Sequence, residues 1–482
     1  MKIQFLYITL IVLTCSACSQ QNKYITDIEK YITNEFENRR IIMIGDYHHD
    51  LALNYQSIIQ ILTTWVNNLR DGETDVFELS LFLEEDDKIT SLLREYMETG
   101  SLEPYLGFSL PSTTMERLEF YADLRRIKIQ VDSLNKYMTS PETITFSVQG
   151  PEKYNVFDSG LIGLPREDGM RFFVEERDSL TAMNIIEYLD DNPTHKALMF
   201  FSSGHLIKNP VIKSTRGVLH DDESYGKYLG YYLKQYYGED DVLILNQLPK
   251  ERAVEWLTRQ VDGNVVLLSE DIQYEEGSMS EDIFYPGHFD GFILRDEIFC
   301  PTFYLKYALS NRIVHASLKR LKALEQYHST DTMGGRLYNE ALLTLQFNSG
   351  EDFTTLQEWN DWYNLGRFNH FPDINSEAFI DQLIRYRFQI TGHFQKMREL
   401  LGFGVPEEII FTEVILESDM RAILAEYINK IKFINAIAIA MVGYPEEIIE
   451  ARKYLVDYSG EKYDEPSDYL KWWRHHNYGA NY

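Results

Sequence analysis

Two patterns of apolar residues alternate between about residue 25 and residue 300. Short apolar runs bounded by turn residues predict buried strands, and apolar residues that recur every three or four positions predict helices. Strands that alternate with helices indicate an α/β fold, in which a mostly parallel sheet is flanked by helices. The expected strands are residues 40–45, 75–80, 127–132, 197–201, 241–246, 264–268 and 290–296. The expected helices include residues 51–69, 169–189 and 225–237.

From about residue 305 the pattern changes, because strand-like runs become rare and helical spacing dominates. The helices expected there are residues 304–327, 376–401, 416–441 and 446–455. Residues 305–482 are therefore predicted to form an all-α, helical-repeat-like domain that follows an α/β domain of residues 19–304.

This C-terminal region repeats, since residues 340–364 align without gaps on residues 450–474. The identical pairs are Glu340/Glu450, Ala341/Ala451, Leu345/Leu455, Ser349/Ser459, Gly350/Gly460, Glu351/Glu461 and Trp362/Trp472. The repeated unit predicts a helix, a Ser-Gly-Glu turn and a short aromatic helix. It resembles the element that closes units in bacterial HEAT-like helical repeats. Tandem helical units offer extended surfaces, so a protein partner or a substrate-shielding role is one interpretation; the other is that the tryptophans pack the turn onto its own helix.

Residues 1–18 have the pattern of a signal peptide rather than of a structural element. A short positive start, Met1-Lys2, precedes an apolar stretch of residues 3–13 that is too short to span a membrane. The segment then ends in Cys15-Ser16-Ala17-Cys18, which resembles a bacterial lipobox. That resemblance implies an exported, membrane-anchored lipoprotein with a lipid on Cys18, on the periplasmic or outer-membrane face. An ordinary cleaved signal peptide is the alternative.

The net charge limits which partners the chain can bind, and the cysteine content limits its disulfides and metal sites. The 482-residue chain has a formal net charge of −29, which repels phosphate backbones and argues against nucleic acid as a partner. Two of the three cysteines belong to the signal peptide, so Cys300 alone remains. An intramolecular disulfide and a zinc–thiolate cluster are therefore excluded for the mature chain.

Polar residues recur where the expected strands end, and they are Asp46, His48, His49, Glu78, Asp132 and His205. The carboxyl ends of parallel strands meet at one edge of a sheet, so these groups can gather although they are far apart in sequence. A carboxylate that interrupts an apolar strand needs a partner, which favours a functional role for Glu78. Taken singly, Asp46 and Asp50 fit helix caps. The histidines expected to be packed or solvated are His195, His220, His315, His328, His393, His475 and His476.

Four short motifs in order carry a resemblance to a known superfamily. They are residues 44–49 (IGDYHH), 76–80 (VFELS), 176–178 (ERD) with Met183-Asn184, and 201–208 (FSSGHLIK). Together they resemble the erythromycin esterase and ChaN-like haem-uptake superfamily, which includes the Tiki and TraB proteins, over roughly residues 38–250. The resemblance puts Asp46 in the place of the family's glutamate. It aligns His49 with the esterases and His48 with ChaN and Tiki, and it matches Glu78, Arg177 and His205 to the remaining positions.

Two hydrolytic mechanisms and one binding role suit these residue types. In the first, His49 acts as general base on water, Asp46 or Glu78 orients it, and Arg177 and His205 act on the electrophile. In the second, His48, Glu78 and His205 ligate a divalent metal whose bound water attacks. No Gly-x-Ser-x-Gly or His-Glu-x-x-His motif occurs, so direct attack by water on an ester or amide ranks first. The third is capture of haem or another small ligand without turnover.

Overall fold

The computed structural model of the chain describes residues 24–46, 52–109, 113–137, 143–153, 163–165, 176–209, 211–212, 225–250, 263–272, 286–295, 305, 310–328, 330, 332–349, 351, 353–365 and 428–478. The chain divides into two compact units. One comprises Met1–Tyr47 and Lys196–Glu297, and the other comprises His48–His195 and Ile298–Tyr482. Across these described ranges, no helix combines the length and the apolar character needed to cross a membrane.

Eight strands form one mixed, mostly parallel sheet in the order β1-β9-β10-β8-β2-β5-β3-β4. The pairs β2–β5, β2–β8, β8–β10 and β3–β4 are parallel, whereas β9 pairs antiparallel with β10 and β1. The fold class expected from the sequence, a mostly parallel sheet with flanking helices and a helical C-terminal region, is confirmed. The bounds are β1 Tyr24–Ile25, β2 Ile41–Asp46, β3 Glu78–Leu83, β4 Thr145–Gln149, β5 Lys196–Ser202, β8 Val242–Pro249, β9 Val265–Leu268 and β10 Gly291–Arg295.

The first unit is built on strands that are apolar on both faces. Every residue of β2 is buried, and so is every residue of β10, as expected for central strands covered on both sides. Helix α2 (Ile28–Asn38) packs against β2 and α9 (Leu229–Tyr237) packs against β8. Asp27 caps α2 by accepting from the Lys30 N–H at 3.1 Å. A small antiparallel pair, β6 (Val211–Ile212) and β7 (Tyr225–Gly226), completes this unit.

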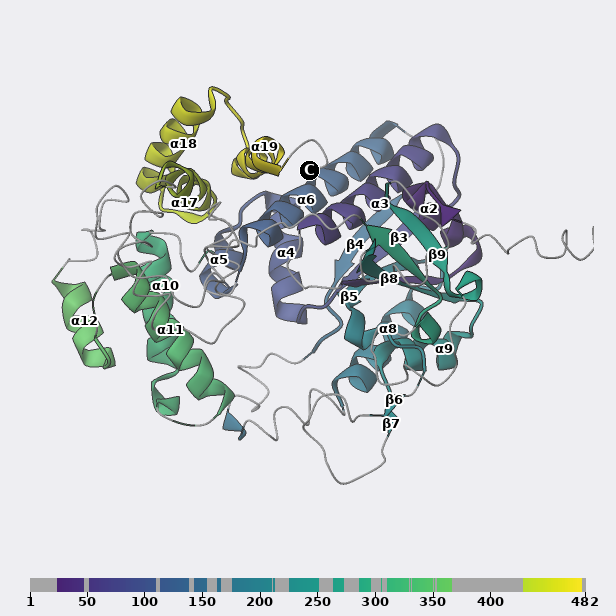
Figure 1. Cartoon of the computed structure of the whole chain (residues 1–482), viewed down its shortest axis with the longest axis horizontal. Coiled ribbons are helices and arrows are strands. Elements are labelled where there is room, and N and C mark those ends of the chain that lie inside the picture. Colours follow the sequence, from purple (N-terminus) through teal and green to yellow (C-terminus); the bar gives the residue numbers. More distant parts are fainter. Residues whose placement is uncertain are drawn as a thin grey trace, which may run out of the picture. The chain divides into compact units, whose positions relative to one another are not determined.

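In the second unit, helices cover the strands β3 and β4. They are α3 (Ala52–Asp71), α4 (Asp87–Thr99), α5 (Glu103–Ser109), α6 (Met115–Tyr137) and α8 (Arg177–Asp191). The long helices α3 and α6 pack together, and α4 packs on α6 and β4 (Figure 1). The strand expected at residues 127–132 is wrong, because these residues continue α6. There Lys128 and Asp132 form an ion pair of 2.7 Å at helical i, i+4 spacing.

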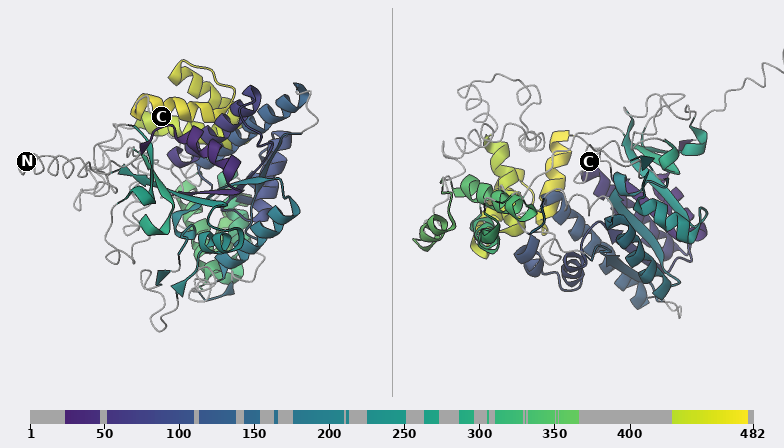
Figure 2. Two further views of the ribbon diagram at one scale, coloured as in Figure 1. Left: turned by 90° about the vertical axis from the view of Figure 1, so that its right-hand side faces the viewer. Right: turned by 90° about the horizontal axis from the view of Figure 1, so that it is seen from below.

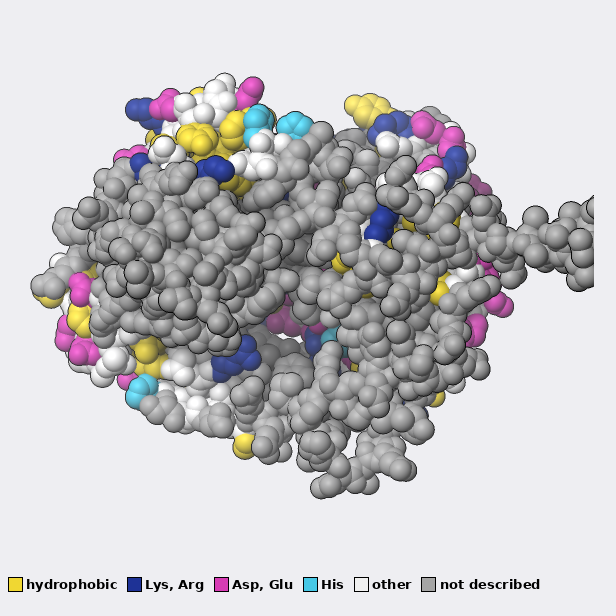
Figure 3. All heavy atoms as spheres, in the orientation of Figure 1, with side chains coloured by type: hydrophobic (Ala, Val, Ile, Leu, Met, Phe, Trp, Pro, Cys, Tyr) yellow, Lys and Arg dark blue, Asp and Glu magenta, His cyan; other side chains and the backbone are white. Residues whose placement is uncertain are grey.

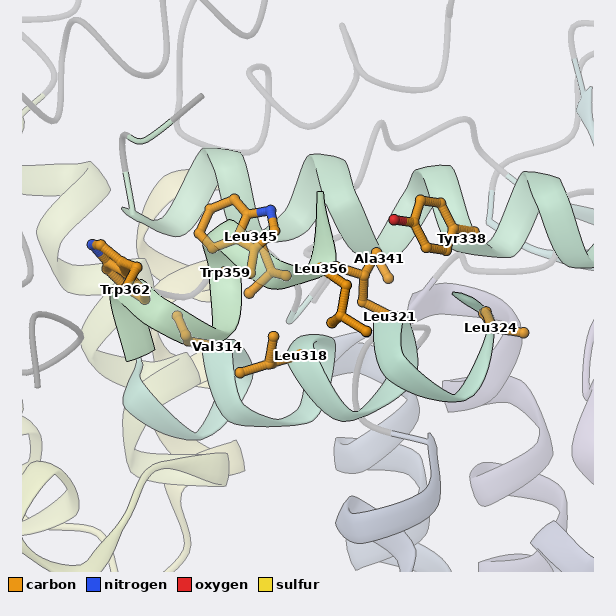
Figure 4. Close-up of a cluster of buried hydrophobic side chains, with 10 residues drawn as sticks. All are labelled: Val314, Leu318, Leu321, Leu324, Tyr338, Ala341, Leu345, Leu356, Trp359 and Trp362. Atoms are coloured by element: carbon orange, nitrogen blue, oxygen red, sulfur yellow. The ribbon is translucent and has the colours of Figure 1, made fainter. Parts of the chain in front are cut away.

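In the described residues of the C-terminal region there are two sets of three helices. The first is α10 (Asn311–Ala323), α11 (Met333–Ser349) and α12 (Leu356–Asn364), and the second is α17 (Ile428–Val442), α18 (Pro445–Ser459) and α19 (Pro466–Tyr478). Figure 4 shows the core of the first set, where Trp359 and Leu345 are fully buried between the helices. The helix expected at residues 376–401 lies outside the described residues.

The two sets share the same turn at atomic detail, which supports the repeat found in the sequence. The Ser349 hydroxyl donates to the Leu345 carbonyl at 2.8 Å and accepts from the Glu351 N–H at 3.1 Å. Ser459 makes the same two contacts at the same distances, with the equivalent residues of its own unit. The aromatic pairs also match, because Phe353–Trp359 and Tyr463–Tyr469 both meet edge to face. The tryptophans and tyrosines thus pack the turn onto its own helices.

Helix α19 lies beside α6, and charged side chains join them (Figures 1 and 2). Arg474 is buried and contacts Glu119 at 2.5 Å and Glu116 at 3.4 Å. Toward solvent, Lys471 contacts Asp123 at 2.9 Å. The last described helix is therefore fixed to the helices of the α/β region by a buried ion-pair cluster.

Candidate functional site

The carboxyl end of β2 carries the first predicted site residue, Asp46, which is only 4% exposed. The Ser203 hydroxyl lies 2.7 Å from the Asp46 carbonyl oxygen and 2.5 Å from Asn246 Oδ1. A hydroxyl has one hydrogen to donate. If the amide of Asn246 is turned about, its NH₂ donates to Ser203 while Ser203 donates to Asp46, which also satisfies an otherwise unpaired amide nitrogen. This network ties the carboxyl ends of β2 and β5 to the middle of β8.

Gly45 allows the three strands to approach this closely at the end of β2. A Cβ at this position would lie 2.7 Å from Asn246 Oδ1 and 3.1 Å from Ser203 Oγ. Both neighbours are buried and hydrogen-bonded to each other, so neither can move aside freely. The glycine that the sequence places before Asp46 is thus required by close packing, and its φ angle is not in the left-handed region.

His205 reaches the same edge from the neighbouring strand. Strand β5 pairs in parallel with β2, with Ser202 opposite Asp46, and His205 ends the short 3₁₀ turn Ser203–His205 that follows. The structure therefore places Asp46 at the last residue of β2 and His205 just after the end of the adjacent strand β5. Their roles in a shared site stay predictions. His48 and His49 follow Asp46 directly in the chain and lie outside the described residues, as does Cys18.

Glu78 has a different position from the one expected. It is the first residue of β3, not the last, so it stands at the amino end of the strand. Its carboxylate lies 3.9 Å from Nε2 of His195, whose Nδ1 lies 2.8 Å from the Ser80 hydroxyl. Burial lowers the pKa of His195, and the Glu78 carboxylate opposes that shift. The expectation that Glu78 closes its strand is wrong, and its catalytic or metal-binding role stays a prediction.

Four acids follow β3 in a row, Glu84 to Asp87, and sequence reasoning missed them. Arg177, the first residue of α8, bridges Glu84 and Glu152: its Nη2 lies 2.8 Å from Glu84, and its Nε donates to Glu152 at 2.9 Å. Burial acts to lower the pKa of Arg177, but the two carboxylates outweigh it and raise it. The cluster can hold its two carboxylates in fixed positions at the ends of β3 and β4. The signal in the sequence was the acid run directly after an apolar strand.

The next two acids have partners of their own. Glu85 contacts Arg117 at 3.1 Å and accepts from the Tyr121 hydroxyl at 3.2 Å. Burial raises the pKa of Glu85, and Arg117 opposes the shift. Asp86 caps α4 by accepting from the Ile89 N–H at 2.7 Å. The first three of these four acids thus take three separate structural tasks.

Histidines outside the predicted site are packed or exposed, as expected from the sequence. His195 is buried, His315 lies 2.9 Å from the Tyr444 hydroxyl, and His328 packs edge-on against Tyr338. His475 and His476 are exposed, and Figure 3 shows histidine side chains at the surface over the C-terminal helices. His220 and His393 lie outside the described residues.

A metal ion held by three His, Cys, Asp or Glu side chains would need ligands beyond the described residues. Within the described ranges, no three His, Cys, Asp or Glu residues are arranged to hold a metal ion. Of the predicted metal set, His48 is outside these ranges, Glu78 begins its strand and His205 follows the end of another. Metal and haem binding therefore stay predictions.

Comparisons with known proteins give distant similarities of fold. No protein-family model matches the chain, and no curated protein matches it. The erythromycin esterase EreC in its open conformation is 12% identical, with 57% of this chain and 99% of that chain covered and a TM-score of 0.36. A succinoglycan biosynthesis protein is 9% identical (55% and 90% covered, TM-score 0.36). A Bacillus cereus protein is 12% identical (55% and 90% covered, TM-score 0.32).

Proposed function

We propose that this chain is a hydrolase that activates water against an ester or amide bond at the carboxyl ends of β2 and β5. The observation that supports this most is the pairing of Asp46 with the strand that leads into His205. The chain leaves this edge with Tyr47-His48-His49, so imidazoles from two segments start from neighbouring strand ends. Ligand sites in open α/β sheets lie at such ends.

In this proposal His49 takes a proton from water and His205 acts on the electrophile. A histidine can serve as general base near neutral pH because its pKa lies close to the working pH. Asp46 comes directly before the segment that carries His49. Its carbonyl is hydrogen-bonded to Ser203, which is in turn hydrogen-bonded to Asn246, and this network fixes the position of Asp46. Arg177 has one of two roles in this proposal. It stabilises developing negative charge, or it holds the carboxylates of Glu84 and Glu152 in place. We further propose that a lipid on Cys18 anchors this activity in the cell envelope.

The test is turnover of p-nitrophenyl esters by the purified full-length protein. We expect His49→Ala and His205→Ala each to lower kcat/KM by about 10²–10⁴-fold, the usual contribution of a general base or acid. His476→Ala, on the exposed face of α19, is the matched control and keeps the wild-type rate. Unchanged rates in both site variants would contradict the proposal.

The same preparation separates the alternatives. Loss of turnover on chelation, restored by a divalent metal, would replace the proposed mechanism with the metal-dependent one through His48, Glu78 and His205. An absorbance band on haem titration without ester turnover would replace it with ligand capture. Turnover that resists chelation and needs His49 supports direct activation of water.

A further inference from the structure

Arg295 is a buried cation that contacts no carboxylate of the described residues. It is the last residue of β10 and is 9% exposed. Its Nε donates to Gln247 Oε1, on the neighbouring strand β8, at 3.0 Å. Its Nη2 is buried and has no hydrogen-bond acceptor. The charge that acts on it is Glu29 of α2, which makes no direct ion pair with it.

Three other arginines in the described part of the chain contact carboxylates directly. Arg117 lies 3.1 Å from Glu85, Arg474 lies 2.5 Å from Glu119, and Arg177 bridges Glu84 and Glu152. A buried cation is costly unless a counter-charge and hydrogen bonds compensate it. Burial lowers the pKa of Arg295 to about 10, and Glu29 offsets this only in part. Arg295 therefore has donors that the described residues leave unused.

The position of Arg295 points to a ligand rather than to a folding contact. It ends a strand whose parallel neighbour β8 ends at Pro249, directly opposite in register. Crevices at the carboxyl ends of parallel strands are where α/β sheets bind small molecules. The contact with Gln247 holds the guanidinium in one orientation, which leaves its Nη groups as a preset pair of donors.

We propose that Arg295 binds the oxyanion group, a carboxylate or a phosphate, of a small molecule at the carboxyl ends of β8 and β10. The planar guanidinium fits both groups through paired charge-assisted hydrogen bonds. Binding would supply the counter-charge that the apoprotein lacks. The inference is independent of the proposed hydrolysis, because it concerns equilibrium binding of an anion.

The test is thermal unfolding of the full-length protein in sodium phosphate or sodium succinate, against sodium chloride of equal ionic strength. A ligand that binds only the folded state raises Tm with a saturable concentration dependence. We expect a saturable rise of several degrees in phosphate, in succinate or in both. A response to one anion alone identifies phosphate or carboxylate as the preferred group, and a response to both identifies their shared chemistry.

Two variants separate specific binding from the general stabilising effect of phosphate, which acts on any protein surface. Arg295→Met removes the charge and keeps most of the volume, so Tm without anion should be unchanged or higher, and the saturable rise should be lost. Arg295→Lys keeps the charge without the planar fork and should weaken the response. Arg474→Met is the matched control at a buried arginine with two carboxylates: it should lower Tm and keep the anion response.

Three outcomes would overturn the proposal. One is a saturable rise of equal size in wild type and Arg295→Met, which assigns the anion to another site. The second is no saturable rise in the wild-type protein with either anion. The third is a lower Tm in Arg295→Met without anion, which shows that the described fold already compensates the charge.

Discussion

The imidazole of His195 lies between Ser80 and Glu78, with its Nδ1 2.8 Å from the Ser80 hydroxyl and its Nε2 3.9 Å from the Glu78 carboxylate. These are the residue types of a serine-hydrolase triad. Ser80, however, is completely buried, and its hydroxyl also lies 3.0 Å from Tyr188 and 2.9 Å from Ser147. No substrate can reach a hydroxyl enclosed in this way. The cluster therefore joins β3, β4 and α8 and does not form a second active site.

This cluster predicts a pH dependence of stability. Burial lowers the pKa of His195 below its ordinary value of 6.5, so the unfolded chain binds a proton at a higher pH than the folded chain does. Stability should therefore fall as pH decreases through about 6.5, and the loss should end below the folded-state pKa. We expect Tm measured from pH 8 to pH 5 to decline less in His195→Asn than in wild type. His476→Asn, at an exposed position, should follow the wild-type curve. Parallel curves for wild type and His195→Asn would exclude this source of pH dependence.

The fold was predictable where apolar runs were long and well bounded. Strand β2 and the strands β8, β9 and β10 lie where the sequence indicated. The strand predicted at residues 127–132 was wrong because two of its three apolar residues, Ile127 and Val131, are also four positions apart, as on one face of a helix. In α6, Ile127 and Val131 are buried, while the intervening Ile129 is 45% exposed. Six residues cannot separate the two periods, and the helix that began at Met115 simply continued.

The site was predictable only in part. The sequence shows which polar residue follows or interrupts an apolar run, but it does not show where the paired strand begins and ends. Asp46 and His205 follow runs with clear ends, and both lie where expected. Glu78 was assigned to a strand end because Val76 and Phe77 precede it. In the structure, β3 begins at Glu78 and ends at Leu83. Which acid meets Arg177 depends on tertiary contacts between distant segments, and no local pattern carries that information.

Lipid anchoring gives a prediction that depends on the sequence alone. If Cys18 is the lipidated first residue of the mature protein, its replacement should abolish the anchor. We expect Cys18→Ala, expressed in a bacterial host, to move from the detergent phase to the aqueous phase in a Triton X-114 partition. Cys300→Ala tests another cysteine outside the predicted lipobox and should remain in the detergent phase. Detergent partitioning of Cys18→Ala equal to that of wild type would contradict the lipobox interpretation.

The bridge formed by Arg177 should matter for stability and for the geometry of the strand ends. In Arg177→Met, the carboxylates of Glu84 and Glu152 lose their shared counter-charge. The three side chains are 14–16% exposed, so we expect a loss of about 1–3 kcal/mol, less than for a completely buried pair. Adding Glu84→Gln to Arg177→Met should recover part of the loss, because one of the facing charges is removed. Lys153→Met, which breaks an exposed pair with Glu187, should change stability by about 0.5 kcal/mol or less. Urea unfolding of the wild type and the three variants measures this, and equal losses in Arg177→Met and Lys153→Met would contradict it.

The buried contact of Arg474 with Glu116 and Glu119 should control whether α19 stays on α6. In Arg474→Met the two carboxylates remain buried, at 1% and 7% exposure, and lose the guanidinium that contacts both. Removal of one partner from a buried ion pair costs about 3–5 kcal/mol. Local opening of α19 should become easier by about 3 kcal/mol, which corresponds to roughly 10²-fold faster amide hydrogen exchange in that helix.

The matched control for this interface is Lys471→Met, because Lys471 is 41% exposed and pairs with Asp123 at the rim. An exposed pair contributes about 0–1 kcal/mol, so exchange in α19 should change by roughly fivefold at most. A triple variant, Arg474→Met with Glu116→Gln and Glu119→Gln, removes all three charges and should return exchange toward the wild-type rate. If α19 exchanges at the wild-type rate in Arg474→Met, apolar contacts such as Trp473 and Leu470, both buried, fix the helix without help from the ion pairs.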